Sequence, residues 1–200
     1  MKARALLALA FSACVAPPPA PTEELPLLPR DPGFLMRQEL RFTYGESSGS
    51  LEAVVQSRCG ELTIVGLAPF GARVFTLVQR GSALEVKLHL PGSWPFPPGN
   101  IARDVHRALL VPLPREAPVG GERDTVYGGE RVHERWREGK LVERELVPDG
   151  RGEARGVRID YRDGATLEVP AREIRLENLD RGYVLGIRTN EHRTLACEPQ

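Results

Sequence analysis

The sequence has no excess charge of either sign, because its 27 lysines and arginines balance 27 aspartates and glutamates. A balanced chain has no net field to draw it to nucleic acid or to an anionic membrane, which disfavours a nucleic-acid-binding role. At 200 residues it is long enough for one domain with a sizeable core and too short for two comfortable ones. We therefore expect a single fold.

The apolar run near the N-terminus is too short to remain in a membrane as a helix. Residues 5–10 (ALLALA) fall well below the roughly 20 residues that span a hydrocarbon core. They follow two basic residues and lead through small residues to Cys14, which is the layout of a secretory signal. Residues 11–14 (FSAC) resemble the bacterial lipobox, in which the signal is cut before a cysteine that becomes acylated. We predict a signal peptide at residues 1–13 and a lipidated Cys14; the alternative is an ordinary signal peptide with a chance cysteine.

Proline is concentrated in the segment after this cysteine. Residues 15–32 contain seven prolines, and proline lacks a backbone donor and favours extended polyproline II geometry. We predict that residues 14–32 are the lipidated cysteine and a tether, which holds a domain at residues 33–200 away from the bilayer. The residue after Cys14 is Val rather than Asp. By resemblance to enterobacterial sorting, this predicts an anchor in the outer membrane with the domain facing the periplasm.

The rest of the chain alternates between short apolar runs and turns, which is typical of a protein rich in strands. Apolar and polar residues alternate along the runs, and the short Gly-containing connections imply antiparallel hairpins. About eleven strands are enough for a curved sheet or an open barrel with a polar outer face and an apolar inner face. The candidate strands are centred on residues 40–44, 51–55, 62–64, 73–77, 84–90, 126–136, 141–147, 157–161, 167–169, 174–176 and 183–187.

One segment in the middle of the chain has helical rather than strand spacing. Residues 100–110 (NIARDVHRALL) place Ile101, Val105 and Leu109 on one face. Asn100 is a plausible N-cap, and Pro112 stops the helix. The helix either closes the mouth of a half-open sheet or packs permanently as core, and the sequence leaves both possibilities open.

The order of these elements resembles the LolA/LolB-like bacterial outer-membrane lipoproteins, in particular their uncharacterised LolB-like members. The resemblance covers roughly Gln38 to Ile187 and is most specific at residues 62–77 (LTIVGLAPFGARVFTL). It implies a mainly β fold, a curved antiparallel sheet that forms an unclosed half barrel with a helix over the opening. Its apolar interior would accommodate acyl chains, each buried methylene contributing about 0.8 kcal/mol.

The function that this resemblance implies is not catalytic. It is that of an outer-membrane-anchored lipoprotein that binds lipid or acylated protein cargo and aids its transfer or insertion, as a monomer and without a cofactor. A periplasmic carrier protein is a possible partner. The residues expected to line the cavity or its lid are Phe42, Leu77, Val86, Trp94, Phe96, Ile101, Val105 and Leu109.

The loop between the third and fourth strands is the second site that the resemblance implies. In LolB this loop projects an apolar side chain that is needed to insert lipoproteins into the membrane. Here the loop contains Leu67, Pro69 and Phe70. Phe70 is either exposed and in contact with lipid, or a buried plug under a tight hairpin; our hypothesis is the first.

Other chemistry has weak support in the sequence. Residues 45–49 (GESSG) match the G-x-S-x-G motif of serine hydrolases, but a strand follows where the motif needs a helix, so a hairpin loop is the better interpretation. The four histidines lack metal-ligand spacing, and we predict no metal site. Once Cys14 is lipidated, Cys59 and Cys197 either pair in an oxidising periplasm or remain free thiols.

Two rival functions remain open from the sequence. One is an envelope assembly or scaffold protein whose cavity is filled by side chains. The other is an enzyme that acts on a lipid or glycolipid, which would require close carboxylates or a Cys–His pair in the cavity.

Overall fold

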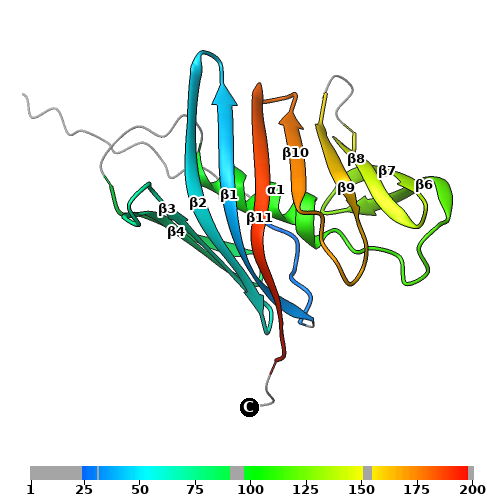
Figure 1. Ribbon diagram of the computed structural model, residues 1–200, viewed down its shortest axis with the longest axis horizontal. Coiled ribbons are helices and arrows are strands. Elements are labelled where there is room, and N and C mark those ends of the chain that lie inside the picture. The colour runs from blue at the N-terminus through cyan, green and yellow to red at the C-terminus, as the bar shows by residue number, and fades with distance from the viewer. Residues whose placement is uncertain (1–23, 31, 91–96, 151–154, 198–200) are drawn as a thin grey trace, which may run out of the picture.

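The computed structural model describes residues 24–30, 32–90, 97–150 and 155–197. In these residues, eleven antiparallel strands form one curved sheet that does not close into a barrel (Figure 1). This confirms the predicted fold class. The strands are β1 (Gly33–Tyr44), β2 (Ser47–Arg58), β3 (Glu61–Leu67), β4 (Arg73–Arg80), β5 (Ala83–Leu88), β6 (Gly120–Tyr127), β7 (Glu130–Arg137), β8 (Lys140–Pro148), β9 (Val157–Ala165), β10 (Glu173–Asn178) and β11 (Tyr183–Leu195).

The strand order is β5-β4-β3-β2-β1-β11-β10-β9-β8-β7-β6. The chain therefore builds one half of the sheet outward from β1 to the edge strand β5. It then crosses to the other edge and returns inward from β6 to β11, which pairs with β1 in the middle of the sheet. The first and last strands of the domain thus hold the two halves together.

Two candidate strands differ from the prediction. Residues 126–136 form the hairpin β6–β7, because Gly128 and Gly129 adopt φ of 59° and 78°, as a two-residue hairpin turn requires. Leu167 and Val169 form no strand and are 59% and 62% exposed in the β9–β10 loop. A backbone hydrogen bond from Thr166 N–H to the Val169 carbonyl, 2.9 Å, closes a turn there. Two apolar residues in alternation were too short a pattern to establish a strand.

The predicted helix exists and lies across the concave face of the sheet (Figure 1). It begins at Pro98 rather than at Asn100, since proline suits the first helical turn. The helix α1 (Pro98–Val105) continues into one π-helical turn, η1 (His106–Leu110). It ends because Pro112 forces the preceding residue, Val111, out of helical geometry. No helix within the described ranges has the length and apolar character needed to cross a bilayer.

The helix divides the apolar interior into two clusters. One lies between α1 and strands β1–β5 and includes Leu40, Ile64 and Leu77. The other lies between η1 and strands β7–β11, and residues such as Phe42, Leu109 and Ile187 contact both clusters.

Residues 24–30, which the sequence assigned to the tether, pack on the domain. Leu25 is 5% exposed within the first cluster, and its N–H donates to the Ser82 carbonyl at 3.2 Å. The ordered domain therefore starts before residue 33. Cys14 and the predicted signal peptide lie outside the described residues.

Cys59 and Cys197 form a disulfide, with their Cα atoms 5.3 Å apart. Cys59 follows β2 and Cys197 follows β11, which are the two neighbours of β1. The bond therefore joins the two strands across the point where the chain enters the sheet at Gly33. A Cβ at Gly33 would approach the Ser57 carbonyl oxygen to 2.6 Å, so only glycine fits between the two neighbouring strands at this position.

Candidate functional site

Buried ion pairs hold the helix on the sheet. The Arg107 guanidinium makes a bidentate pair with Glu130 of β7, at 2.5 and 3.0 Å, and a further bond to Asp104 at 3.2 Å. The Tyr183 hydroxyl of β11 donates to the other oxygen of the Asp104 carboxyl. These groups are all buried, so displacing the helix would leave Glu130 on the sheet without its cationic partner.

A second buried pair satisfies the π-helical turn. Arg144 of β8 and Glu134 of β7 lie 2.6 Å apart, and their side chains are 1% and 0% exposed. Arg144 also donates to the Arg107 carbonyl at 2.9 Å, while the Tyr161 hydroxyl donates to the Ala108 carbonyl at 3.0 Å. A π-turn leaves carbonyls without their usual i+4 partner. Here the side chains of Arg144 and Tyr161, on the sheet, donate to these carbonyls instead.

His106 ties the helix to both halves of the sheet. Its Nε2 lies 2.6 Å from the Oε1 of Gln79 on β4, and its Nδ1 lies 2.9 Å from the Tyr127 hydroxyl on β6. The Gln79 amide nitrogen donates to two carbonyls, which identifies its Oε1 as an acceptor. His106 therefore carries its proton on Nε2 and accepts from Tyr127. Of the two interpretations of the helix, these contacts favour an element packed as part of the core.

The buried groups on the helix give opposing pH dependences. Burial raises the pKa of Asp104 from 3.8 to about 6, so its contribution to stability is lost as pH rises from about 4 to 6. Burial, with a smaller effect of Arg103, lowers the pKa of His106 from 6.5 to about 4, so its contribution is lost as pH falls through that window. We expect the two slopes largely to cancel in the wild-type protein.

Asp104→Asn will remove the contribution of Asp104 to the pH dependence of stability and leave the opposite contribution of His106. The variant should lose up to about 1.4 kcal/mol of unfolding free energy per pH unit on acidification from about pH 6.5 to 4. Urea unfolding at half-unit pH steps measures this, and His106→Asn is the matched control, with a slope of the opposite sign. An Asp104→Asn profile as flat as that of the wild type would contradict the assignment.

A cavity of about 570 Å³ lies between η1, the start of β1 and the β9–β10 loop. Its volume is within the range of small-molecule sites. Most of its lining is apolar, and Leu167 of the β9–β10 loop lies at its rim with 59% exposure. Its apolar lining includes Phe34, Met36, Leu109, Leu113, Leu167 and Ile174.

Of the residues predicted to line a cavity, Leu109 borders this one. The others lie elsewhere because the helix fills the rest of the concave face. Phe42, Leu77, Ile101 and Val105 pack in the core between helix and sheet. Val86 is 45% exposed on the edge strand β5, and Trp94 and Phe96 lie outside the described residues.

The β9–β10 loop was missed as a site because its apolar residues were assigned to a strand. Residues 165–171 contribute most of one wall of the cavity. The available signal was a cluster of apolar residues interrupted by Pro170, which a ladder of strand hydrogen bonds does not accommodate.

The loop between β3 and β4 lies where the sequence placed it. Phe70 is fully exposed and adopts φ of 79°, a backbone conformation that costs a bulky residue about 1–2 kcal/mol. Gly71 N–H donates to the Ala68 carbonyl at 3.0 Å, and Ala68 N–H donates to the Ala72 carbonyl at 2.8 Å, which closes the loop. Phe70 is therefore displayed to solvent by the loop, and it does not plug the hairpin.

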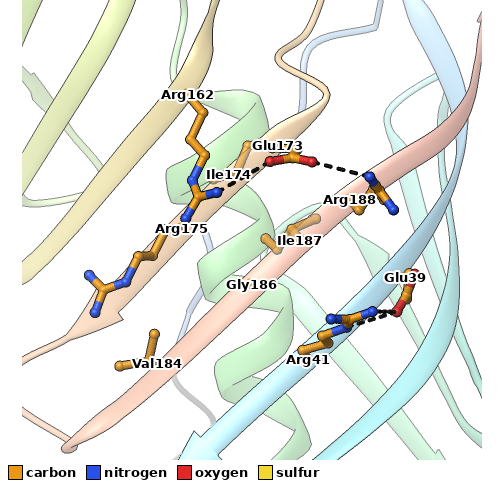
Figure 2. Close-up of a pocket in the computed structure, with 10 residues that line it drawn as sticks. All are labelled: Glu39, Arg41, Arg162, Glu173, Ile174, Arg175, Val184, Gly186, Ile187 and Arg188. Atoms are coloured by element: carbon orange, nitrogen blue, oxygen red, sulfur yellow. Dashed lines mark hydrogen bonds and ion pairs between the residues drawn. The ribbon is translucent and has the colours of Figure 1, made fainter.

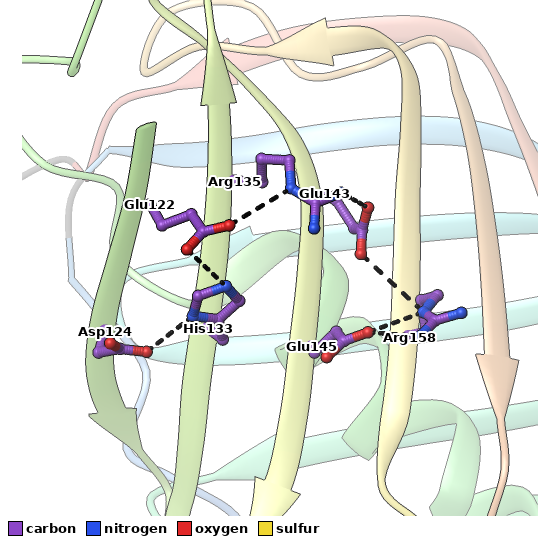
Figure 3. Close-up of polar contacts among 7 residues, drawn as sticks. All are labelled: Glu122, Asp124, His133, Arg135, Glu143, Glu145 and Arg158. Carbon is purple, nitrogen blue, oxygen red and sulfur yellow. Dashed lines mark hydrogen bonds and ion pairs between the residues drawn. The ribbon is translucent and has the colours of Figure 1, made fainter. Parts of the chain in front are cut away.

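The outer face of β6–β9 carries charged side chains in cross-strand pairs, as Figure 3 shows. His133 contacts Asp124 at 2.8 Å and Glu122 at 3.8 Å, and the bond to Asp124 raises the pKa of the histidine. Trp136 on the same strand is buried. In the described part of the chain, no group of His, Cys, Asp or Glu side chains has the arrangement of a metal site.

The G-x-S-x-G segment is a hairpin tip. Gly45 and Glu46 form the turn between β1 and β2, and Ser47 is the first residue of β2. A strand follows the serines, so the segment does not have the strand–turn–helix geometry of a hydrolase elbow.

The chain is similar to several solved structures, and three of these come from bacteria. A LolA superfamily protein from Nitrosomonas europaea has a TM-score of 0.47 at 11% identity, over 86% of this chain and 89% of that one. A DUF1329 family protein from Desulfovibrio piger has a TM-score of 0.43 at 10% identity, over 81% and 85%. A domain described as an outer membrane lipoprotein-sorting protein, from Vibrio parahaemolyticus, has a TM-score of 0.47 at 8% identity, over 84% and 88%.

None of the curated proteins matches the chain. A family model described as a protein of unknown function (DUF3261) matches residues 35–191, from β1 to β11. The chain belongs to the DUF3261 family.

Proposed function

We propose that the protein is an outer-membrane lipoprotein, anchored through Cys14, which binds an acyl chain of lipid or lipoprotein cargo and aids its transfer into the membrane. It acts as a monomer and catalyses no reaction. The observation that carries this proposal is the apolar cavity beside η1. A chain that buries about a dozen methylenes there gains roughly 10 kcal/mol before the costs of association.

Two of the polar side chains that border the cavity already have partners within the protein. The Arg144 guanidinium and the Tyr161 hydroxyl are already bonded to Glu134 and to helix carbonyls. They therefore need no polar group from the ligand. Binding by alkyl contact alone would make the cavity tolerant of chain identity, as a carrier or receptor requires.

Leu109→Glu tests the cavity directly. A carboxylate on the cavity wall should weaken binding of a palmitate-length fluorescent fatty acid at least tenfold, because the acyl chain cannot hydrogen-bond to it. Val119→Glu is the matched control: Val119 is 86% exposed and does not border the cavity. Fluorescence titration measures the affinities, and thermal unfolding verifies that both variants fold.

Measurements on the wild-type protein distinguish the acyl-carrier function from the scaffold function. A carrier copurifies with acyl chains detectable by mass spectrometry and binds the probe. A wild-type protein that does neither would contradict the proposal and favour an assembly role.

Phe70 would supply the membrane contact. Its exposed ring gains about 1.5–3 kcal/mol on leaving water for lipid, so Phe70→Glu should slow delivery of acylated cargo to vesicles at least tenfold. The variant should fold normally, since the side chain makes no buried contact. Arg73→Glu at the exposed start of β4 is the control for added negative charge near the loop. Equal transfer rates for Phe70→Glu and the wild type would show that Phe70 has no part in the delivery of cargo.

A further inference from the structure

Gly186 lies in the central strand of the sheet, where glycine weakens pairing and often marks a close approach of ligand or backbone. Two other strand glycines have a local reason. A Cβ at Gly49 or Gly66 would come within 2.5 or 2.4 Å of the ring of Phe42 or Phe75. At Gly186 the nearest atoms are 3.9 and 4.0 Å away, and its φ lies outside the left-handed region. A side chain would fit there, so its absence hollows the outer face of the sheet.

Two arginines flank this glycine. Arg41 of β1 and Arg175 of β10 are its register partners on either side, and Figure 2 shows all three at the hollow. Cross-strand pairs of opposite charge stabilise a sheet, so a carboxylate on the strand between two arginines would pair favourably with them. At this position the strand provides no side chain.

The neighbouring row of cross-strand residues shows an alternation of arginine and carboxylate, which the glycine interrupts in its own row. Glu173 lies 3.5 Å from Arg162 and 3.4 Å from Arg188, and Arg188 is in register with Glu39 on β1. Arginine and carboxylate thus alternate across four strands. In the Gly186 row the alternation would place a carboxylate at the glycine.

The hollow has a volume of about 330 Å³ and is lined by four arginines and two glutamates. Carboxylates hold the arginines in place: Glu39 binds Arg41 at 2.8 Å, and Glu177 binds Arg175 at 2.8 Å, with Asp160 at 4.0 Å. Each guanidinium has five N–H donors, and these pairs occupy only part of them. Each of the two arginines therefore keeps N–H donors beyond those that its carboxylate occupies.

We propose that this hollow binds a phosphate group, which takes the place of the missing carboxylate between Arg41 and Arg175. A single carboxylate matches one guanidinium fork, whereas phosphate has enough oxygens to accept from guanidiniums on two strands at once. The site lies on the outer face of β1, β11 and β10, away from the acyl cavity, so it does not depend on the proposed function. The phosphate belongs either to a lipid headgroup or to a soluble molecule.

The test is calorimetric titration of the purified full chain in non-ionic detergent with three probes. Inorganic phosphate and glycerol 3-phosphate represent soluble sources, and monomeric dihexanoyl phosphatidylglycerol represents a headgroup. We expect saturable binding of at least one probe, weakened at least tenfold in Gly186→Val, which fills the hollow without changing its charge. Arg37→Gln removes one exposed arginine of the same face, paired with Glu52 at 3.7 Å, and should change affinity less than twofold.

Gly186→Glu supplies the missing carboxylate from the chain itself. It should abolish phosphate binding and raise the thermal unfolding temperature, since the new carboxylate places a negative charge between the two arginines. Binding of the soluble probes assigns the site to a soluble phosphate, and binding of the lipid probe alone assigns it to a headgroup. Absence of saturable binding by all three probes, or binding that survives in Gly186→Val, overturns the proposal.

Discussion

Glu134→Ala will lower the free energy of unfolding by about 3–5 kcal/mol. Its carboxylate is fully buried and is the ionic partner of Arg144, whose side chain is 1% exposed. Removing the carboxylate leaves a guanidinium charge in the core, with water unable to solvate it. Arg144 also supports a carbonyl of the π-turn, so its displacement would loosen η1 and the cavity wall.

Glu145→Ala is the matched control for that measurement. Glu145 lies 2.6 Å from Arg158, the same separation as the buried pair, but both side chains are well exposed. An exposed pair contributes at most about 1 kcal/mol, because water screens the charges. Chemical denaturation of both variants gives the comparison. Similar losses at the two sites would show that burial does not set the strength of the Arg144 pair.

A double replacement distinguishes the cost of an orphaned charge from the value of the pair itself. Glu134→Leu combined with Arg144→Met removes both charges and restores apolar volume. Such exchanges are often neutral or stabilising in protein cores. We expect the double variant to recover much of the loss, short of the bonds that Arg144 makes to the Arg107 carbonyl and Tyr161.

The alternating pattern predicted most of the sheet, because inward positions are apolar over long stretches such as β3 and β4. The same pattern did not predict the buried pair, because the charged segment around Arg144 resembles a solvated face. A register shift between Leu141 and Glu143 changes the phase of β8 and turns Arg144 inward. One inserted residue exchanges the two faces of a strand, and nothing in the local sequence signals it.

The candidate site was predicted unevenly for a similar reason. The β3–β4 loop follows from hairpin spacing, and Phe70 is exposed in that loop. The cavity depends on where the helix rests, which polar contacts such as Asp104 to Tyr183 decide across 79 residues of sequence. Hydrophobic periodicity marks which face of a helix is buried, but contains no information on which part of the sheet it covers.

Replacing Cys59 and Cys197 with Ser will lower the free energy of unfolding by about 5 kcal/mol in the chain-entropy model. The bond closes a loop with a sequence separation of 138, so its loss greatly expands the ensemble of unfolded chains. Urea unfolding measures the change, and the wild type under reducing conditions should match the double variant. A reduced wild type that keeps its urea midpoint would contradict the prediction.

The same replacement should also weaken acyl binding, which links the disulfide to the cavity. The bond clamps the ends of β2 and β11 across the start of β1, and Gly33, Phe34 and Thr194 at this point border the cavity. Without the clamp, the β1–β11 end can fray and the wall loses its fixed position. We expect weaker binding of the fatty-acid probe even in conditions where the variant remains folded. Unchanged affinity would show that the strand ladder alone positions the wall.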